Sequence, residues 1–244
     1  MALIIGKVHK ANHLIGSTGA DTLYGGMLAD TLDGGAGNDQ FNPGAGADLI
    51  HGGLGNDSVW AGYGNDTVFG DDGDDWISGG NGRTTSSTNL TLNGGAGNDT
   101  IAGGLGADRL NGGADNDVIY GDAGNDTLNG GAGRDVINGG AGADTFVFVS
   151  AGEANGDRLK SFDGAGAAAG DKIDLSAMDA DVTLAANQAF VWNSHAKGGV
   201  WLADVDGETV ICGNNDGDAA AEWQIVIGDG AVTAATYTAA DFVL

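Results

Sequence analysis

Residues 121–147 read GDAGNDTLN GGAGRDVIN GGAGADTFV, which is three nine-residue units in direct succession. The sixth residue of each unit is aspartate, as in Asp126 and Asp135, and the eighth is apolar, as in Leu128 and Ile137. Glycine fills most of the first, second and fourth positions. A short fixed period of this kind predicts a solenoid in which every unit adds one strand and one turn to a continuous stack.

The period extends over more than half of the chain. Seven units run without a gap from Gly16 to Ser78, and six more run from Gly94 to Val147. The sixth position is aspartate in every unit: Asp21, Asp30, Asp39, Asp48, Asp57, Asp66, Asp75, Asp99, Asp108, Asp117, Asp126, Asp135 and Asp144. The eighth position is always apolar, so each unit is expected to contribute one side chain to a thin core.

Two segments follow the pattern imperfectly. Between the two blocks, residues 79–93 form the same unit with extra residues near 83–88, and Leu90 replaces the aspartate. Residues 7–15 fall into register with Asn12 at the aspartate position and Leu14 at the core position. We therefore expect residues 1–15 to form a degenerate N-terminal cap and residues 16–147 to form the repeat domain.

The composition agrees with this pattern and excludes several classes of protein. The 244 residues include 48 glycines and one proline, which rules out collagen. The formal net charge of −25 would repel nucleic acid and anionic lipid, and no stretch is long and apolar enough to span a membrane. A single cysteine allows no internal disulfide.

Glycine and aspartate at these positions point to calcium. Glycine permits positive φ, so that successive carbonyl groups can turn toward one point, and aspartate adds carboxylate oxygens. Calcium takes six to eight such hard oxygens. In a stack of such units, neighbouring carboxylates at about 4.8 Å would repel each other unless a cation lay between them. A purely structural alternative, local Asx-turns, would not need a partner at a fixed spacing.

The thirteen units resemble the GGxGxDxUx repeat of RTX proteins, which is known as a calcium-binding β-helix repeat. The resemblance implies an all-β, right-handed parallel β-roll in which six residues of each unit form a turn, three form a short strand, and two units, eighteen residues, make one coil. It implies that calcium lies between stacked turns, held by the thirteen aspartates and by turn carbonyls. From the number of units we expect about eight to eleven ions, with fewer on the even edge near Leu90.

The segment from 148 to 244 loses the nine-residue period. Alternating stretches at 189–192, 199–202, 208–212 and 223–227 predict an antiparallel β capping region with turns at 206–207 and 216–217. This region resembles the C-terminal domain of serralysin-type metalloproteases, including the acidic-then-apolar ending at 241–244. The resemblance implies a type I secretion signal, export to the extracellular side or cell surface without an N-terminal signal peptide, and the type I machinery as a partner.

No catalytic pattern accompanies the repeats. The four histidines never form HExxH, and no GxSxG motif is present, so the chain is expected not to be an enzyme. Two alternatives to a self-contained calcium-folded module stay open. One is the noncatalytic C-terminal part of a serralysin-like protease or other exoenzyme.

The other alternative is a module that binds cell-surface or extracellular polysaccharide, comparable to the R modules of mannuronan epimerases. Outward positions on the odd face include aromatic residues that could stack on sugars: Tyr24, Trp60, Trp76 and Tyr120. Basic residues for an acidic polymer are few, namely Arg83, Arg109 and Arg134.

Overall fold

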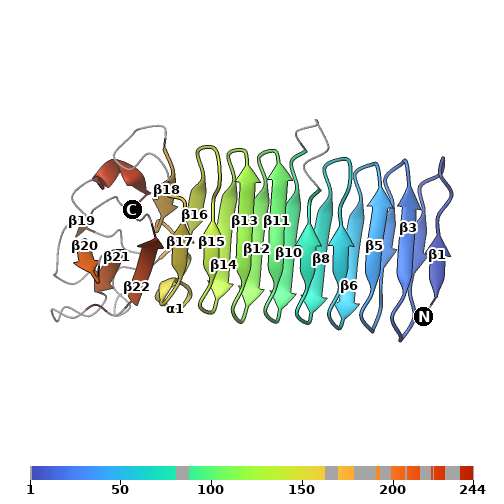
Figure 1. The fold of residues 1–244 in the computed structure, drawn as a ribbon, viewed down its shortest axis with the longest axis horizontal. Coiled ribbons are helices and arrows are strands. Elements are labelled where there is room, and N and C mark those ends of the chain that lie inside the picture. The colour runs from blue at the N-terminus through green and yellow to red at the C-terminus, as the bar shows by residue number, and fades with distance from the viewer. Residues whose placement is uncertain are drawn as a thin grey trace.

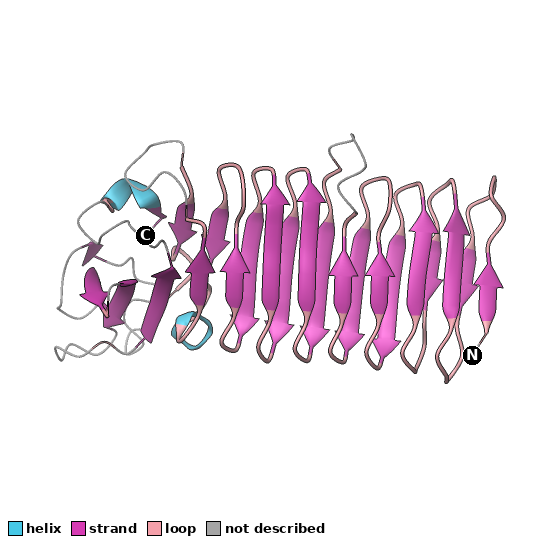
Figure 2. Ribbon diagram, viewed as in Figure 1, coloured by secondary structure: helices cyan, strands magenta, loops and turns pink. Residues whose placement is uncertain are grey.

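The structure is a computed structural model that describes residues 2–80, 88–162, 170–178, 191–192, 199–206, 208–214, 221, 223–228 and 237–243. Coils of chain stack along one long axis, with the N-terminus at one end and the C-terminal region at the other (Figure 1). Nearly all described secondary structure is strand (Figure 2). The all-β parallel roll expected from the repeats is therefore confirmed.

Strands of odd number form the first sheet. Its roll strands pair in parallel in the order β1 (Leu3–Ile5), β3 (Thr22–Gly26), β5 (Gln40–Gly44), β7 (Ser58–Trp60), β9 (Trp76–Ser78), β11 (Thr100–Leu105), β13 (Val118–Ala123), β15 (Val136–Asn138) and β17 (Arg158–Lys160).

The even-numbered strands of the roll, followed by β23, form the second sheet. It runs in the order β2 (His13–Ile15), β4 (Thr31–Asp33), β6 (Leu49–Leu54), β8 (Thr67–Asp72), β10 (Thr91–Ala96), β12 (Arg109–Ala114), β14 (Thr127–Ala132), β16 (Thr145–Val147), β18 (Lys172–Asp174) and β23 (Phe242–Val243). The separation of odd and even units, two to a coil, is as the period predicts.

One apolar side chain per unit fills the space between the sheets. Leu23, Leu32 and Ile50 are fully buried, and the same column continues along the roll to Phe146. In the N-terminal cap, Leu14 pairs with Leu32 and packs against this core, as expected from its register. Ile4, which lay outside any recognised unit, occupies the same column in β1 and pairs with Leu23.

Many strands are longer than the residue pattern suggested. We expected three strand residues and six turn residues per unit, and β4 and β15 have that length. Strands such as β6 and β10 have six residues, because the first residues of the next unit also pair with the neighbouring coil. Gly53 pairs with Asp71 and Leu54 with Asp72 in this way.

The parallel stack extends beyond residue 147. Strands β17 and β18 pair in parallel with β15 and β16, so the end of the nine-residue spacing is not the end of the roll. A four-residue helix, α1 (Ala151–Ala154), lies between β16 and β17 and is capped by Ser150, which accepts the Glu153 N–H at 3.2 Å.

The C-terminal region is only partly antiparallel. Strands β20 (Gly199–Val205), β21 (Glu208–Asn214) and β22 (Trp223–Gly228) form the predicted antiparallel sheet. In contrast, β19 (Val191–Trp192) pairs in parallel with β20, and β22 and β23 add in parallel to the exposed edges of β17 and β18. The antiparallel expectation is thus wrong for these contacts, because the parallel edges left by the last coil still need partners for their backbone groups.

Asp206 connects β20 to β21 with a φ of 53°, in keeping with the hairpin turn predicted there. Gly207, the predicted turn at 216–217 and most of the insertion at 83–88 lie outside the described residues. None of the described helices is long and apolar enough to cross a membrane.

Candidate metal sites

The aspartate at the sixth position of each unit lies at the end of a turn, two residues before the core side chain. All thirteen are buried, with at most 3% of their surface exposed. Each carboxylate joins two coils: Asp57 Oδ1 accepts the Asp39 N–H at 2.7 Å, and Asp126 Oδ1 accepts the Asp108 N–H at 2.8 Å. Since these bonds span eighteen residues, the carboxylates connect neighbouring coils by hydrogen bonds and do not form Asx-turns.

These bonds produce two ladders, one on each edge of the roll. The odd ladder contains Asp21, Asp39, Asp57, Asp75, Asp99, Asp117 and Asp135. The even ladder contains Asp30, Asp48, Asp66, Asp108, Asp126 and Asp144. The ladders are those that unit parity predicts.

The second oxygen of most ladder carboxylates has no hydrogen-bond partner although it is buried. This holds for Oδ2 of Asp30, Asp39, Asp48, Asp57, Asp66, Asp75, Asp99, Asp108, Asp117, Asp126 and Asp135. A buried carboxylate oxygen without a partner costs several kcal/mol of folding free energy in general, unless a cation compensates it. A column of such oxygens is what a row of bound cations would require.

Glycine at the first position makes room beside most of these oxygens; Pro43 and Ala61 take that position in the units of Asp48 and Asp66. A Cβ added to Gly103 would lie 2.6 Å from Asp108 Oδ2 and 2.9 Å from the carbonyl oxygen of Gly121 in the next coil. The hollow left by the missing side chain is therefore lined by one carboxylate and one carbonyl oxygen from successive coils. This oxygen-only donor set suits calcium, which binds hard oxygen ligands, and not a thiolate- or imidazole-preferring metal.

Burial raises the pKa of the ladder carboxylates. The pKa of Asp57, Asp66, Asp99 and Asp126 is raised to about 7, and that of Asp117 to about 8, mainly because the charged form is desolvated. Neighbouring ladder carboxylates add to the increase, and the inter-coil N–H bond opposes it. Uncompensated by a cation, these groups resist ionisation at neutral pH.

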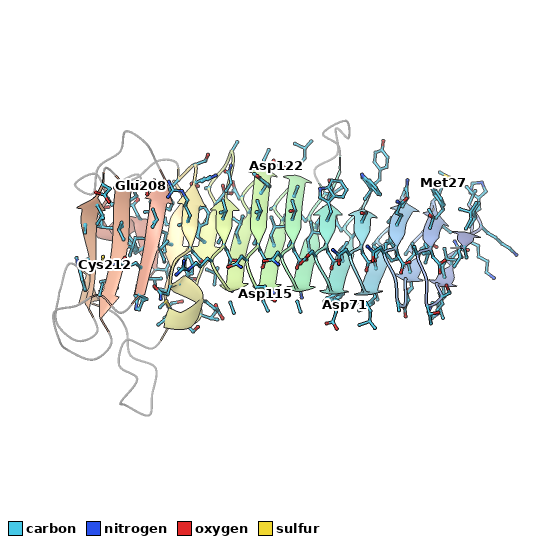
Figure 3. The ribbon with its side chains drawn as sticks, turned by 60° about the horizontal axis from the view of Figure 1, so that its bottom comes forward. Met27, Asp71, Asp115, Asp122, Glu208 and Cys212 are labelled. Carbon is cyan, nitrogen blue, oxygen red and sulfur yellow. The ribbon has the colours of Figure 1, made fainter. Side chains whose placement is uncertain are left out.

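Three further aspartates stand where the pattern has glycine. Asp71 and Asp122 replace the glycine at the second position of their units, and Asp115 replaces the glycine at the fourth position. All three have φ between 68° and 76°, a conformation that aspartate tolerates better than most residues do. Asp71 and Asp115 lie along one edge of the roll and Asp122 along the opposite edge (Figure 3). Their charges raise the pKa of nearby ladder residues, including Asp75, Asp117 and Asp108.

Leu90 interrupts the even ladder, as expected. Its backbone N–H still donates to Asp108 Oδ1 at 2.8 Å, but its buried side chain supplies no oxygen toward Asp66. The odd ladder passes the same point unbroken, because the Asp75 N–H donates to Asp99 Oδ1 at 2.7 Å across 24 residues. The odd ladder thus keeps its register although the spacing here is 24 residues and not eighteen.

Both ladders continue past the last nine-residue unit, which the sequence reasoning missed. The Asp135 N–H donates to Asp157 Oδ1 at 2.8 Å, and the Asp144 N–H donates to Asp171 Oδ1 at 2.9 Å. Asp157 and Asp171 are fully buried, and Asp157 Oδ2 has no hydrogen-bond partner. The aspartate, any residue, apolar residue pattern at 157–159 and 171–173 is the signal that could have revealed them.

At the opposite end both ladders stop. Asn12 occupies the aspartate position of the first even coil, and its side-chain amide donates to Asp30 Oδ1 at 2.8 Å. Ala2 takes the corresponding odd position and donates its N–H to Asp21. The Ser17 N–H also donates to Asp21 Oδ2. Hydrogen bonding by the Ser17 side chain, and then by the Ala2 and Ser17 N–H groups, lowers the pKa of Asp21.

The described residues, those of the ladders included, hold no group of three or more histidine, cysteine or acidic side chains arranged for one metal ion. Any site on the ladders must therefore draw most of its ligands from backbone carbonyls and only one or two from carboxylates. That is the division of ligands expected from the glycine-rich turns.

Comparison with known proteins agrees with this geometry. The model of an RTX calcium-binding nonapeptide repeat matches four segments, residues 10–41, 51–85, 91–119 and 112–146, which together cover half of the chain. The chain belongs to the RTX calcium-binding nonapeptide-repeat family. The RTX match falls on the roll and ends close to the last nine-residue unit, before Asp157 and Asp171.

Two solved structures similar to this RTX chain come from a mannuronan C5-epimerase of Azotobacter vinelandii. The AlgE6R3 subunit is 28% identical, with 66% of this chain and 81% of that chain covered and a TM-score of 0.35. The AlgE6R2 subunit is 22% identical, with 70% and 88% covered and a TM-score of 0.41. No curated protein matches the sequence.

Proposed function

We propose that the chain is a secreted module that folds when its carboxylate ladders bind calcium. The thirteen repeat aspartates would be ligands, together with Asp157 and Asp171 of the C-terminal region. The observation that carries the proposal is the column of buried Oδ2 atoms without hydrogen-bond partners. Removing the cations would leave these oxygens uncompensated, at a cost comparable to the whole stability of a domain, roughly 5–15 kcal/mol.

The number of ions follows from the number of stacked levels. We propose about eight to eleven ions, because a calcium ion shared by two successive coils needs an aspartate on at least one of them. Leu90 replaces the aspartate of one even unit, so the calcium site at that unit is weaker. Bound calcium would also neutralise most of the net charge of −25. On this proposal, the acidic composition of the chain serves mainly to bind calcium.

Export by a type I system fits this dependence on calcium. RTX repeats are typical of secreted proteins, and calcium is scarce in the cytosol but about millimolar outside the cell, enough to fill even sites with Kd of about 10⁻⁴ M. The ladders would stay unfolded before export and fold afterwards. Asp241 and Phe242, part of the proposed secretion signal, are buried against β18 in the folded chain, so the signal would be accessible only before folding.

Circular dichroism with and without calcium tests the proposal. We expect little strand signal in chelator, abundant strand signal at millimolar calcium, and poor replacement by magnesium, which prefers tight octahedral sites that keep several waters. Ion counting by native mass spectrometry on the same samples gives the stoichiometry. A roll that is fully formed in chelator would contradict the proposal.

The second candidate function is the noncatalytic part of a longer exoenzyme. The absence of HExxH and GxSxG motifs from the sequence fits this candidate as well as it fits the first. Both candidates share the same calcium chemistry. They differ only in whether a catalytic domain accompanies the roll in the cell, which the mass of the exported protein would decide.

A further inference from the structure

The outer face of the first sheet carries a hollow of about 740 Å³, lined by residues of β3, β5 and β7. These strands belong to the N-terminal part of the roll. This volume lies in the range of sites for small molecules and short polymer segments, roughly 300–1,000 Å³. It lies on the outside of the sheet, whereas the aspartate ladders face inward. The hollow is therefore separate from the proposed calcium sites.

Glycines form the floor of the hollow and aromatic rings form its walls. Gly26, Gly44 and Gly62 stack from coil to coil along the floor. Tyr24 and Trp60 are each 42% exposed beside them. Side chains at Gly44 or Gly62 would collide with the backbone of the preceding coil, so the stacking that builds the roll also keeps this floor open.

The aromatic wall continues on both sides of Trp60. Tyr63, which is 55% exposed, lines the hollow after Gly62. Trp76 on β9 meets Trp60 with ring centroids 5.1 Å apart and planes inclined by 59°. Large aromatic rings exposed side by side on one sheet are uncommon unless they contact a partner.

The polar groups of the hollow are uncharged. Thr22, Gln40 and Asn42 contribute hydroxyl and amide groups, and no acidic or basic residue is among the described residues that line it. This is unusual for a chain with a net charge of −25. An ionic ligand would lose its hydration here without gaining a counter-charge.

We propose that this hollow, which we call the aromatic groove, binds a neutral polysaccharide chain. A pyranose ring presents C–H groups on its flat faces, which the negative faces of tyrosine and tryptophan attract, and hydroxyl groups at its rim, which amides can bind through donors and acceptors. Nucleic acid also stacks on aromatic rings but needs a cationic groove for its phosphates. A uronate polymer lacks a cation here to pair with its carboxylates.

The groove accounts for only part of the aromatic set singled out from the sequence. Tyr24 and Trp60 line it, and Trp76 supports Trp60. Tyr120 on β13, which has the same position in its unit as Trp60, is 39% exposed but does not line the hollow. Tyr120 is thus a matched control inside the same protein.

The test uses the full chain loaded with calcium, since the groove exists only on the folded roll of the proposed function. Affinity electrophoresis and quenching of tryptophan fluorescence would be measured with a soluble β-glucan, a galactomannan and, for comparison, a polyuronate. We expect at least one neutral polymer to bind saturably. Trp60→Ala should weaken binding about tenfold, as the loss of one stacking ring predicts, while Tyr120→Ala leaves binding unchanged.

Several results would overturn the proposal. These are no retardation by either neutral polymer, preference for the polyuronate, or equal weakening by Trp60→Ala and Tyr120→Ala. A fourth is a concentration-dependent dimer that Trp60→Ala abolishes, because the groove would then be covered by a second copy of the chain. Circular dichroism and ion counting on each variant separate these results from a failure of the roll to fold with calcium.

Discussion

The position-six aspartate has two distinct tasks, one for each of its oxygens. Oδ1 holds the previous coil through a backbone N–H, as Asp57 does with Asp39, and Oδ2, which is buried without a hydrogen-bond partner, is the proposed calcium ligand. The corresponding amide, asparagine, could keep the first task but not the negative charge of the second. Substitution by asparagine therefore separates the structural role of the residue from its ligand role.

Asp57→Asn should lose one or two calcium ions and shift the folding midpoint to higher calcium concentration, because each ladder carboxylate faces two successive levels. Native mass spectrometry and a calcium titration followed by circular dichroism would measure both effects. Asp206→Asn, in an exposed hairpin turn that is not part of either ladder, should change neither. An unchanged ion count in Asp57→Asn would contradict the ligand role.

Leu90→Asp should have the opposite effect, since it restores the missing rung between Asp66 and Asp108. We expect one additional ion and a lower calcium concentration at the folding midpoint. Without calcium the same change adds another buried charge, so it should further destabilise the empty roll. Equal ion counts for Leu90→Asp and the parent chain would show that the even level at residue 90 cannot form a site.

Protons should partly replace calcium. The pKa of ladder residues such as Asp75 and Asp157 is raised from 3.8 to about 6 and about 8, so the folded state retains protons that the unfolded chain releases. The stabilisation by these protons is fully present below about pH 3.8 and is lost as the pH rises through 6 to 8. In chelator, strand content should therefore increase on acidification; a decrease would contradict the raised pKa values.

At the scale of the elements, β17 and β18 join the repeat domain to the C-terminal region. β17 pairs with β15 on one side and with β22 on the other. Arg158, the first residue of β17, also forms a bidentate ion pair with Glu208 at the start of β21. The antiparallel sheet is thus attached to the last odd level of the ladder, at Asp157.

Asp157→Asn should consequently remove one ion and increase hydrogen exchange in β22, while β5 and β7 stay protected. Glu208→Gln is the control, because its ion pair with Arg158 is 38% exposed on both sides and such pairs contribute about 1 kcal/mol or less. Exchange mass spectrometry resolved by segment would measure the difference. Equal exchange in both variants would show that calcium at this level does not stabilise the C-terminal sheet.

The sequence could predict every element whose residues obey the period of nine. The core column from Leu23 to Phe146, the two ladders and the gap at Leu90 all follow from counting. Asp157 and Asp171 could not be reached by counting, because 22 and 27 residues separate them from their partners. Parallel pairing of β22 and β23 depends on which sheet edges the last coil leaves open, which only the assembled stack determines.

At the scale of the whole molecule, an elongated roll and an acidic unfolded chain differ greatly in size. Thirteen strands in the first sheet, at about 4.8 Å each, give a rod about 60 Å long. The unfolded chain should have a radius of gyration of about 54 Å, and mutual repulsion of its carboxylates would expand it further.

Small-angle X-ray scattering should therefore show the radius of gyration falling to less than half on addition of millimolar calcium, and recovering in chelator. Magnesium at the same ionic strength controls for simple screening of charge and should cause only a small contraction. A similar contraction with both ions would mean that charge screening, and not specific coordination, compacts the chain.

The coil that contains residues 81–87 shows how the stack tolerates added length. Its neighbours keep their register, with Thr91 opposite Thr67 and Trp76 opposite Thr100, although the spacing there is 24 residues. A lengthened loop costs only the slowly growing entropy of closure, while the rungs on either side stay in place. Foreign sequence inserted between residues 80 and 88 would accordingly be displayed on a scaffold that, on the proposed function, folds when calcium is added and unfolds when calcium is removed.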